Sequence, residues 1–127
     1  MELNEKQLDT KAKIESFSKL FNLDPNWTLA IAMAESSLGL GQLSPTGCKG
    51  AFQMSSIAMK DLLQEMGKVD SDLVDIACGL SFLYLLLKRH KTIDEATAHF
   101  CDPKDRTFYL NRVHSYMNSF NSEVSNG

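Results

Sequence analysis

Two Asp-Pro pairs, Asp24-Pro25 and Asp102-Pro103, divide the chain into segments with helical periodicity. Aspartate is a favoured N-cap and proline is favoured at the first helical position, so each pair predicts the start of a helix. Strand-like alternation of polar and apolar residues is nearly absent. The 127 residues leave no room for a second core of ordinary size. We therefore expect a single all-α domain over residues 1–127.

Six helices are predicted, arranged around one central helix. Their expected ranges are 4–21, 25–38, about 55–66, 71–90, 93–101 and about 103–120. Residues 71–90 are apolar on nearly all sides in their second half, which is typical of a helix surrounded by others. In the first helix, five apolar residues are expected near one face: Leu8, Ile14, Phe17, Leu20 and Phe21. Glycines and Pro45 between residues 39 and 50 predict a structured loop or short hairpin, and residues 121–127 are expected to be frayed.

The charge of the chain bears on its partners. A net charge of −3 and a pI of about 5.5 give no basic field that would attract phosphate, so we expect no nucleic-acid partner. The N-terminal residues MELNEKQLDTKAK are charged and lack the apolar segment of a signal peptide. The longest apolar run, residues 77–87, is about half the length of a membrane span. We expect a chain that is made in the cytoplasm and is not stably inserted in a membrane.

No metal or cofactor is predicted. The three cysteines, Cys48, Cys78 and Cys101, are an odd number without a CxxC pair, so free thiols packed as small hydrophobic residues are expected. Residues 70, 72 and 75 are aspartates and faintly resemble a calcium loop. Val74 stands where a ligand is needed and the turn glycine is missing, so these acids are expected in the first turn of a helix.

Glu35 is the one charged residue in an apolar helical segment, WTLAIAMAES (27–36). It lies one turn after Ile31 and three residues before Leu38, and therefore shares their face. An apolar setting penalises the charged carboxylate and raises its pKa, so the group can donate a proton near neutral pH. This pattern makes Glu35 a candidate catalytic acid. The alternatives are a structural glutamate held by Arg or Lys, or one at a helix end that reaches water.

A second pattern follows Glu35-Ser36 in the segment SPTGCKGAFQM (44–54). Together the two segments resemble the signature of the soluble lytic transglycosylase family, within the lysozyme-like superfamily. The matching positions are Glu35, Ser36, Ser44, Pro45, Gly47, Lys49, Gly50 and Gln53. Cys48 replaces the alanine that is common in the family. The resemblance covers about residues 24–113 and leaves the first twenty residues without a counterpart.

The resemblance implies a lysozyme-like fold and a site that cleaves peptidoglycan, with Glu35 as the catalytic acid. Six residues would bind the glycan strand: Ser36, Gly50, Gln53, Met54, Phe100 and Tyr109. Four of these have a structural alternative. Ser36 is equally suited to cap its own helix and Gln53 to anchor the loop, while Phe100 could be core packing and Tyr109 a half-buried anchor. Phe100 stands where the family has tyrosine, and residues 101 and 103 stand where it has Asn and Gly.

The distribution of acids indicates a mechanism with one carboxylate. Lysozymes carry their second carboxylate after the helix of the acid, but no Asp or Glu occurs from Ser36 to Lys60. The resemblance implies that Glu35 protonates the glycosidic oxygen while the substrate's N-acetyl group stabilises the developing cation. Glu35 then accepts the proton of the C6 hydroxyl, which closes a 1,6-anhydro ring. Asp102 or Asp105 leaves hydrolysis by a muramidase open as the alternative.

A non-catalytic structural or peptidoglycan-binding module is the alternative of another class. The altered segment 100–103 favours it, whereas Glu35-Ser36 and Gly50–Gln53 favour the enzyme. Peptidoglycan glycan strands are the expected partner, and a monomer is expected. A single domain without a signal peptide indicates a phage-encoded protein, which would act on the wall during lysis or as a component of the virion.

Overall fold

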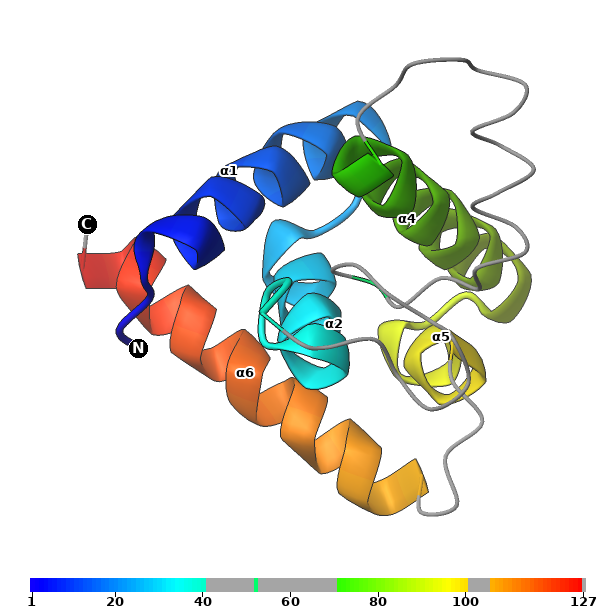
Figure 1. Ribbon diagram of the computed structural model, residues 1–127. Coiled ribbons are helices and arrows are strands. Elements are labelled where there is room, and N and C mark those ends of the chain that lie inside the picture. Colours follow the sequence, from blue (N-terminus) through cyan, green and yellow to red (C-terminus); the bar gives the residue numbers. More distant parts are fainter. Residues whose placement is uncertain (41–51, 53–70, 101–105, 127) are drawn as a thin grey trace.

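The computed structural model describes residues 1–40, 52, 71–100 and 106–126. Within these residues the chain forms five helices and no strand, which confirms the all-α class (Figure 1). The helices are α1 (Glu5–Leu20), α2 (Pro25–Ser36), α4 (Ser71–His90), α5 (Ile93–Phe100) and α6 (Arg106–Asn126). The helix expected near residues 55–66 lies outside the described residues, and so does the expected loop apart from Leu40 and its neighbour Gly39.

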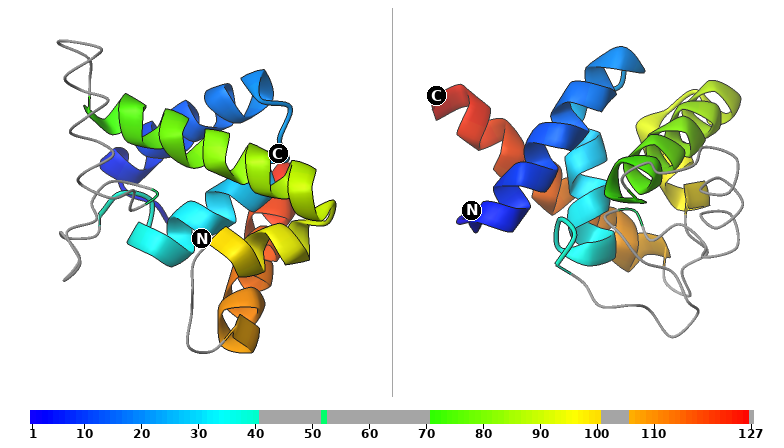
Figure 2. Two further views of the ribbon diagram at one scale, coloured as in Figure 1. Left: turned by 90° about the vertical axis from the view of Figure 1, so that its right-hand side faces the viewer. Right: turned by 45° about the horizontal axis from the view of Figure 1, so that its top comes forward.

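Helix α2 is the centre of the described structure. Eight of its twelve residues are buried, and Trp27, Ala30 and Ile31 have no exposed surface. Helices α1 and α6 lie on one side of α2, and α4 and α5 lie on the other (Figures 1 and 2). Among the described helices, α2 and α6 make the most extensive contact. A helix that is apolar on nearly all sides is stable only in such a position.

Residues 71–90 form helix α4 as predicted, but this helix is not the central one. Tyr84 and Leu85 are 45% and 39% exposed. The buried apolar face of α4 consists of Ile76, Leu80, Leu83 and Leu86. This spacing of three or four residues is that of an amphipathic helix at the side of a core, and the leucine-rich stretch extends beyond the buried face. Neither α4 nor any other described helix combines the length and the apolar character needed to span a bilayer.

The core-facing side of α1 is narrower than predicted. Ile14 is fully buried, and Phe17 and Phe21 pack against the core. Leu8 and Leu20 are 51% and 79% exposed, so the prediction is wrong for these two residues. At about 100° per residue, each of them lies about 120° around the helix from Ile14. Helical spacing alone does not determine which side of α1 meets the core.

The helix ends mostly follow the caps expected from sequence. The Asp24 carboxylate accepts the Asn26 N–H at 2.9 Å, and Pro25 occupies the first helical position of α2. The end of α6 differs, because the helix continues to Asn126 instead of ending near Phe120 with a frayed tail. No glycine or proline occurs between residues 121 and 126 to end it earlier.

Phe52 fixes α4 to the core from outside the helices. Its side chain is 1% exposed, and its N–H donates to Asp75 Oδ2 at 2.9 Å. The ring lies directly on Gly79, where a Cβ atom would overlap it. Asp75 is 1% exposed. The prediction of a first-turn acid therefore needs correction at this position, since Asp75 is a buried acceptor in the second turn of α4.

Candidate active site

Glu35 lies in the last turn of α2, one residue before the helix ends at Ser36. The preceding residues 27–33 are all buried, whereas Glu35 is half-buried. Ala34 and Glu35 are thus partly exposed, whereas Ser36, which follows them, is buried again. A carboxyl group in this position is largely removed from water but keeps some exposed surface.

Tyr109 of α6 lies against the carboxyl group of Glu35. The Tyr109 hydroxyl donates a hydrogen bond to Glu35 Oε1 at 2.8 Å, and the tyrosine is 8% exposed. The contact joins residues 74 positions apart in the chain and is made possible by the close packing of α2 on α6. The structure therefore brings together two of the residues that the sequence predicted for the site.

Burial raises the pKa of Glu35 above its ordinary value. Two smaller effects oppose this increase, namely the hydrogen bond from Tyr109 and the positive charge of Arg112, which both lower the pKa. The net direction is upward, so the protonated acid persists to a higher pH than in a free glutamate. The same two groups stabilise the carboxylate once the proton has left. The site can therefore both release a proton and take one back.

Arg112 is a member of the site that sequence analysis did not identify. It follows Tyr109 by three residues on α6, so the two share a helix face. The Arg112 guanidinium carbon lies 5.8 Å from the ring centroid of Tyr116, close enough for a cation–π contact. The spacing of these three residues was visible in the sequence. It could not be used there, because nothing in the sequence tells which face of α6 meets α2.

Ser36 forms hydrogen bonds at the C-terminal end of α2. It is 4% exposed, and its Oγ donates to the Ala32 carbonyl at 3.1 Å and accepts the Gly39 N–H at 2.9 Å. These contacts support the cap, which is one of the two interpretations that the sequence left open for Ser36. Its neighbour Ser37 already has a left-handed backbone, with φ of 51°.

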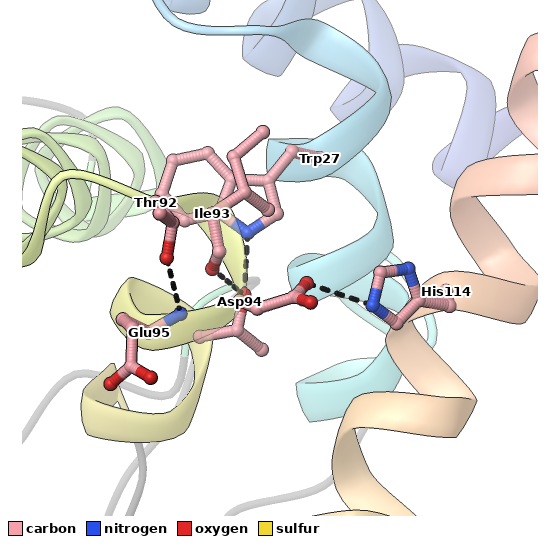
Figure 3. Close-up of polar contacts among 7 residues, drawn as sticks. Trp27, Thr92, Ile93, Asp94, Glu95 and His114 are labelled. Atoms are coloured by element: carbon pink, nitrogen blue, oxygen red, sulfur yellow. Dashed lines mark hydrogen bonds and ion pairs between the residues drawn. The ribbon is translucent and has the colours of Figure 1, made fainter.

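Helix α5 connects the two helices that carry the site (Figure 3). Trp27 of α2 donates from its indole N–H to Thr97 Oγ1 at 2.8 Å, and this hydroxyl donates to the Ile93 carbonyl at 2.7 Å. On the other side, Asp94 pairs with His114 of α6 at 2.8 Å. The pairing of α2 with α6 is thus supported by a third helix.

Phe100 is the last residue of α5, and its ring contacts α4. Its ring lies 5.7 Å from the ring of Phe82, with the two rings tilted at 45°. Phe100 is half-buried and packs against the core, which supports its interpretation as core packing. Among the contacts that the structure describes, none joins Phe100 to Glu35.

The other predicted site residues, Gly50, Gln53 and Met54, lie outside the described residues. So do Asp102 and Asp105, which the sequence left open as a second carboxylate. Of the three cysteines, the described one is Cys78, a half-buried free thiol whose pKa is raised by burial and by the charge of Asp75. The described ranges contain no group of three or more His, Cys, Asp or Glu side chains placed to hold a metal ion.

The described side chains of the site supply proton transfer. A carboxyl group with a raised pKa, a phenol that donates to it and a guanidinium whose charge acts on it can serve as an acid–base unit. In comparisons with known proteins, no family model, no curated protein and no solved structure matches the chain.

Proposed function

We propose that the chain is a lysozyme-like lytic transglycosylase that cleaves the β-1,4 bond between N-acetylmuramic acid and N-acetylglucosamine in peptidoglycan. The observation that carries the proposal is Glu35, which lies half-buried in the last turn of the central described helix with a raised pKa and a hydrogen bond from Tyr109 at 2.8 Å. The sequence pattern of residues 35–54 supports the choice of substrate, because it resembles that of enzymes acting on this polymer.

Cleavage begins with proton transfer from Glu35 to the glycosidic oxygen. The bond from this oxygen to the anomeric carbon breaks, and the N-acetylglucosamine part leaves with a free hydroxyl. Positive charge develops at the anomeric carbon, and the N-acetyl oxygen of the muramic acid stabilises it. Glu35 is now a carboxylate, which Tyr109 and Arg112 stabilise.

Ring closure returns the proton to the enzyme. The C6 hydroxyl oxygen of the muramic acid bonds to its own anomeric carbon, and its proton passes to the Glu35 carboxylate. No water is consumed, and the product ends in a 1,6-anhydro ring. The intramolecular hydroxyl has a large proximity advantage over water, which favours this outcome at a site with one carboxylate.

Digestion of purified peptidoglycan in ¹⁸O-labelled water tests the proposal. We expect wild type to release anhydromuropeptides without the label, and Glu35→Gln to lose at least about a hundredfold in rate, because the amide has no acidic proton. Glu95→Gln is the matched control, since this glutamate is exposed on α5 and should leave the rate unchanged.

Two outcomes would replace the proposal. Label at the new reducing end would mean hydrolysis, and the enzyme would be a muramidase with a second carboxylate. Binding of wild type to peptidoglycan without any cleavage would mean a non-catalytic module. Activity of Glu35→Gln within a few-fold of wild type would show that Glu35 is not the acid.

A further inference from the structure

Helix α1 packs against α2 and is hydrogen-bonded to it near its start and just beyond its end. Near the start of α2, Ser18 Oγ and Thr28 Oγ1 are 2.7 Å apart in a buried contact. Beyond the end of α2, Gln7 Nε2 donates to the Ser37 carbonyl at 3.0 Å. The second contact lies two residues from Glu35, and the first lies almost two turns away from it.

The backbone that Gln7 contacts has an unusual conformation. Ser37, Leu38 and Gly39 all have left-handed backbones, with φ of 51°, 57° and 86°. Residues with side chains adopt this conformation only where surrounding contacts hold it. Local hydrogen bonds include those from Ser37 N–H to the Met33 carbonyl at 3.0 Å and from Gly39 N–H to Ser36 Oγ at 2.9 Å. Gln7 adds a contact from another helix.

The side chain of Gln7 is itself fixed. Its Oε1 accepts the Asn4 N–H at 3.0 Å, and its own N–H donates to Asn4 Oδ1 at 2.9 Å, which together form the capping box of α1. Gln7 is 8% exposed. One amide group therefore uses its oxygen to start α1 and its nitrogen to hold the turn after Glu35. A glutamate at this position would keep the first contact and lose the second.

We propose that Gln7 is a positioning residue for Glu35, which fixes the end of α2 so that the carboxyl group stays aligned with Tyr109. The inference rests on the proposed function for its catalytic consequence. It assigns a role to α1, for which the sequence resemblance offered no counterpart. The turn after Glu35 is additionally close to α1 at Gly39, where an added Cβ would lie 3.3 Å from Thr10 Oγ1.

Gln7→Met tests the inference, because methionine has a similar length and no hydrogen-bond donor. Ser18→Ala is the matched control, since it removes a hydrogen bond from the same helix pair at the end remote from Glu35. We expect Gln7→Met to lower kcat on the order of tenfold with KM nearly unchanged, as small misplacements of a catalytic group have large effects. Ser18→Ala should keep the kcat of wild type.

A second readout needs no substrate. Titration of the Glu35 carboxyl by ¹³C NMR should show a higher pKa in Gln7→Met, because a looser carboxyl loses part of the Tyr109 hydrogen bond that lowers the pKa. Ser18→Ala should titrate as wild type. Should Gln7→Met fail to fold, Gln7→Glu replaces it, because glutamate keeps the oxygen that accepts from Asn4 and lacks the donor to Ser37. A lowered kcat in Gln7→Glu would then support the positioning role, and a kcat equal to that of Ser18→Ala would overturn it.

The two proposals fail in different ways. An inactive wild type overturns the proposed function, while the Glu35 titration still tests positioning. An active wild type with equal kcat and equal Glu35 titration in the Gln7 and Ser18 variants overturns the positioning role alone.

Discussion

Burial has the largest effect on the pKa of Glu35, and two neighbouring groups partly offset this effect. Burial alone would make a strong proton acceptor that is slow to release its proton. Tyr109 and Arg112 act in the opposite direction, so the carboxylate formed by proton release is not left without stabilisation. Because the pKa of Glu35 is raised on balance, ionisation of this group lowers the stability of the folded state, and this effect can be measured without any substrate.

The first prediction concerns the pH dependence of stability. Because the folded-state pKa of Glu35 is raised, the stabilisation from proton binding is complete below the unfolded pKa and is lost as pH rises through the folded pKa. Glu35→Gln removes this titration and keeps an acceptor for Tyr109. We expect its free energy of unfolding, relative to wild type, to be higher at about pH 8 than at about pH 4.

Urea unfolding at both pH values checks this expectation. A parallel series on Glu95→Gln, which is exposed on α5, corrects for general effects of removing a carboxylate. A relative stability of Glu35→Gln that does not increase between the two pH values would contradict a raised pKa of Glu35.

The second prediction concerns Arg112 and the pH profile of activity. Its charge lowers the pKa of Glu35, so Arg112→Gln should raise that pKa and keep the acid protonated to higher pH. We therefore expect the alkaline limb of kcat/KM against pH to move upward. Arg89→Gln on α4 is the control, because it changes net charge equally at an exposed position. If the alkaline limb does not move, or moves equally in both variants, the charge of Arg112 does not lower the pKa of Glu35.

At the residue scale, the sequence predicted Glu35 and Tyr109 as candidate site residues, and the structure brings these two together, but the sequence did not predict their surroundings. Glu35 could be identified because a lone charge in an apolar helix is unusual and local in sequence. Arg112 and Gln7 act across helix pairs, and their roles depend on which helix faces meet. Helical periodicity defines faces but leaves open which helix each face contacts.

At the element scale, the bounds of α1, α2, α4 and α5 were predicted to within about two residues, whereas the end of α6 and the layers of the helices were not predicted. Local rules for caps and stop signals gave the start of α2 at Pro25 and the bounds of α4. The central place of α2 depends on the sum of contacts from α1, α5 and α6, which no local rule contains. Leucines such as Leu85 made α4 look central, although its buried face is ordinary in width.

The third prediction concerns Gly79, where α4 meets Phe52. Alanine normally stabilises a helix interior by about 1 kcal/mol relative to glycine. At this position the added methyl group would overlap the Phe52 ring, and such overpacking costs about 1–3 kcal/mol. We expect Gly79→Ala to lower the free energy of unfolding, measured by urea titration. Ser81→Ala, at an exposed position of the same helix, should be nearly neutral.

A double-mutant cycle identifies the cause. In a Phe52→Ala background the steric conflict is gone, so Gly79→Ala should no longer be destabilising. Equal effects of Gly79→Ala in both backgrounds would mean that the Phe52 ring is not what the new methyl group meets.

At the scale of the whole molecule, α5 joins the two sides of the described structure. Its buried contact with α2 is the hydrogen bond from Trp27 to Thr97, whose residues are 0% and 1% exposed. Its polar contact with α6 is the pair of Asp94 and His114, whose side chains are 61% and 48% exposed (Figure 3). If the helices form one cooperative unit, loss of the buried contact should weaken the whole fold.

The last prediction uses Trp27, the single tryptophan of the chain, as a reporter of this cooperativity. Thr97→Val keeps the shape of the side chain but leaves the buried indole N–H without its acceptor, which costs about 1–3 kcal/mol. Urea transitions followed by tryptophan emission and by far-UV circular dichroism should therefore move to lower urea together. His114→Ala removes only the exposed pair and should cost about 0–1 kcal/mol. Separation of the two transitions in Thr97→Val, with emission changing first, would show that α5 detaches from α2 while the remaining helices stay folded.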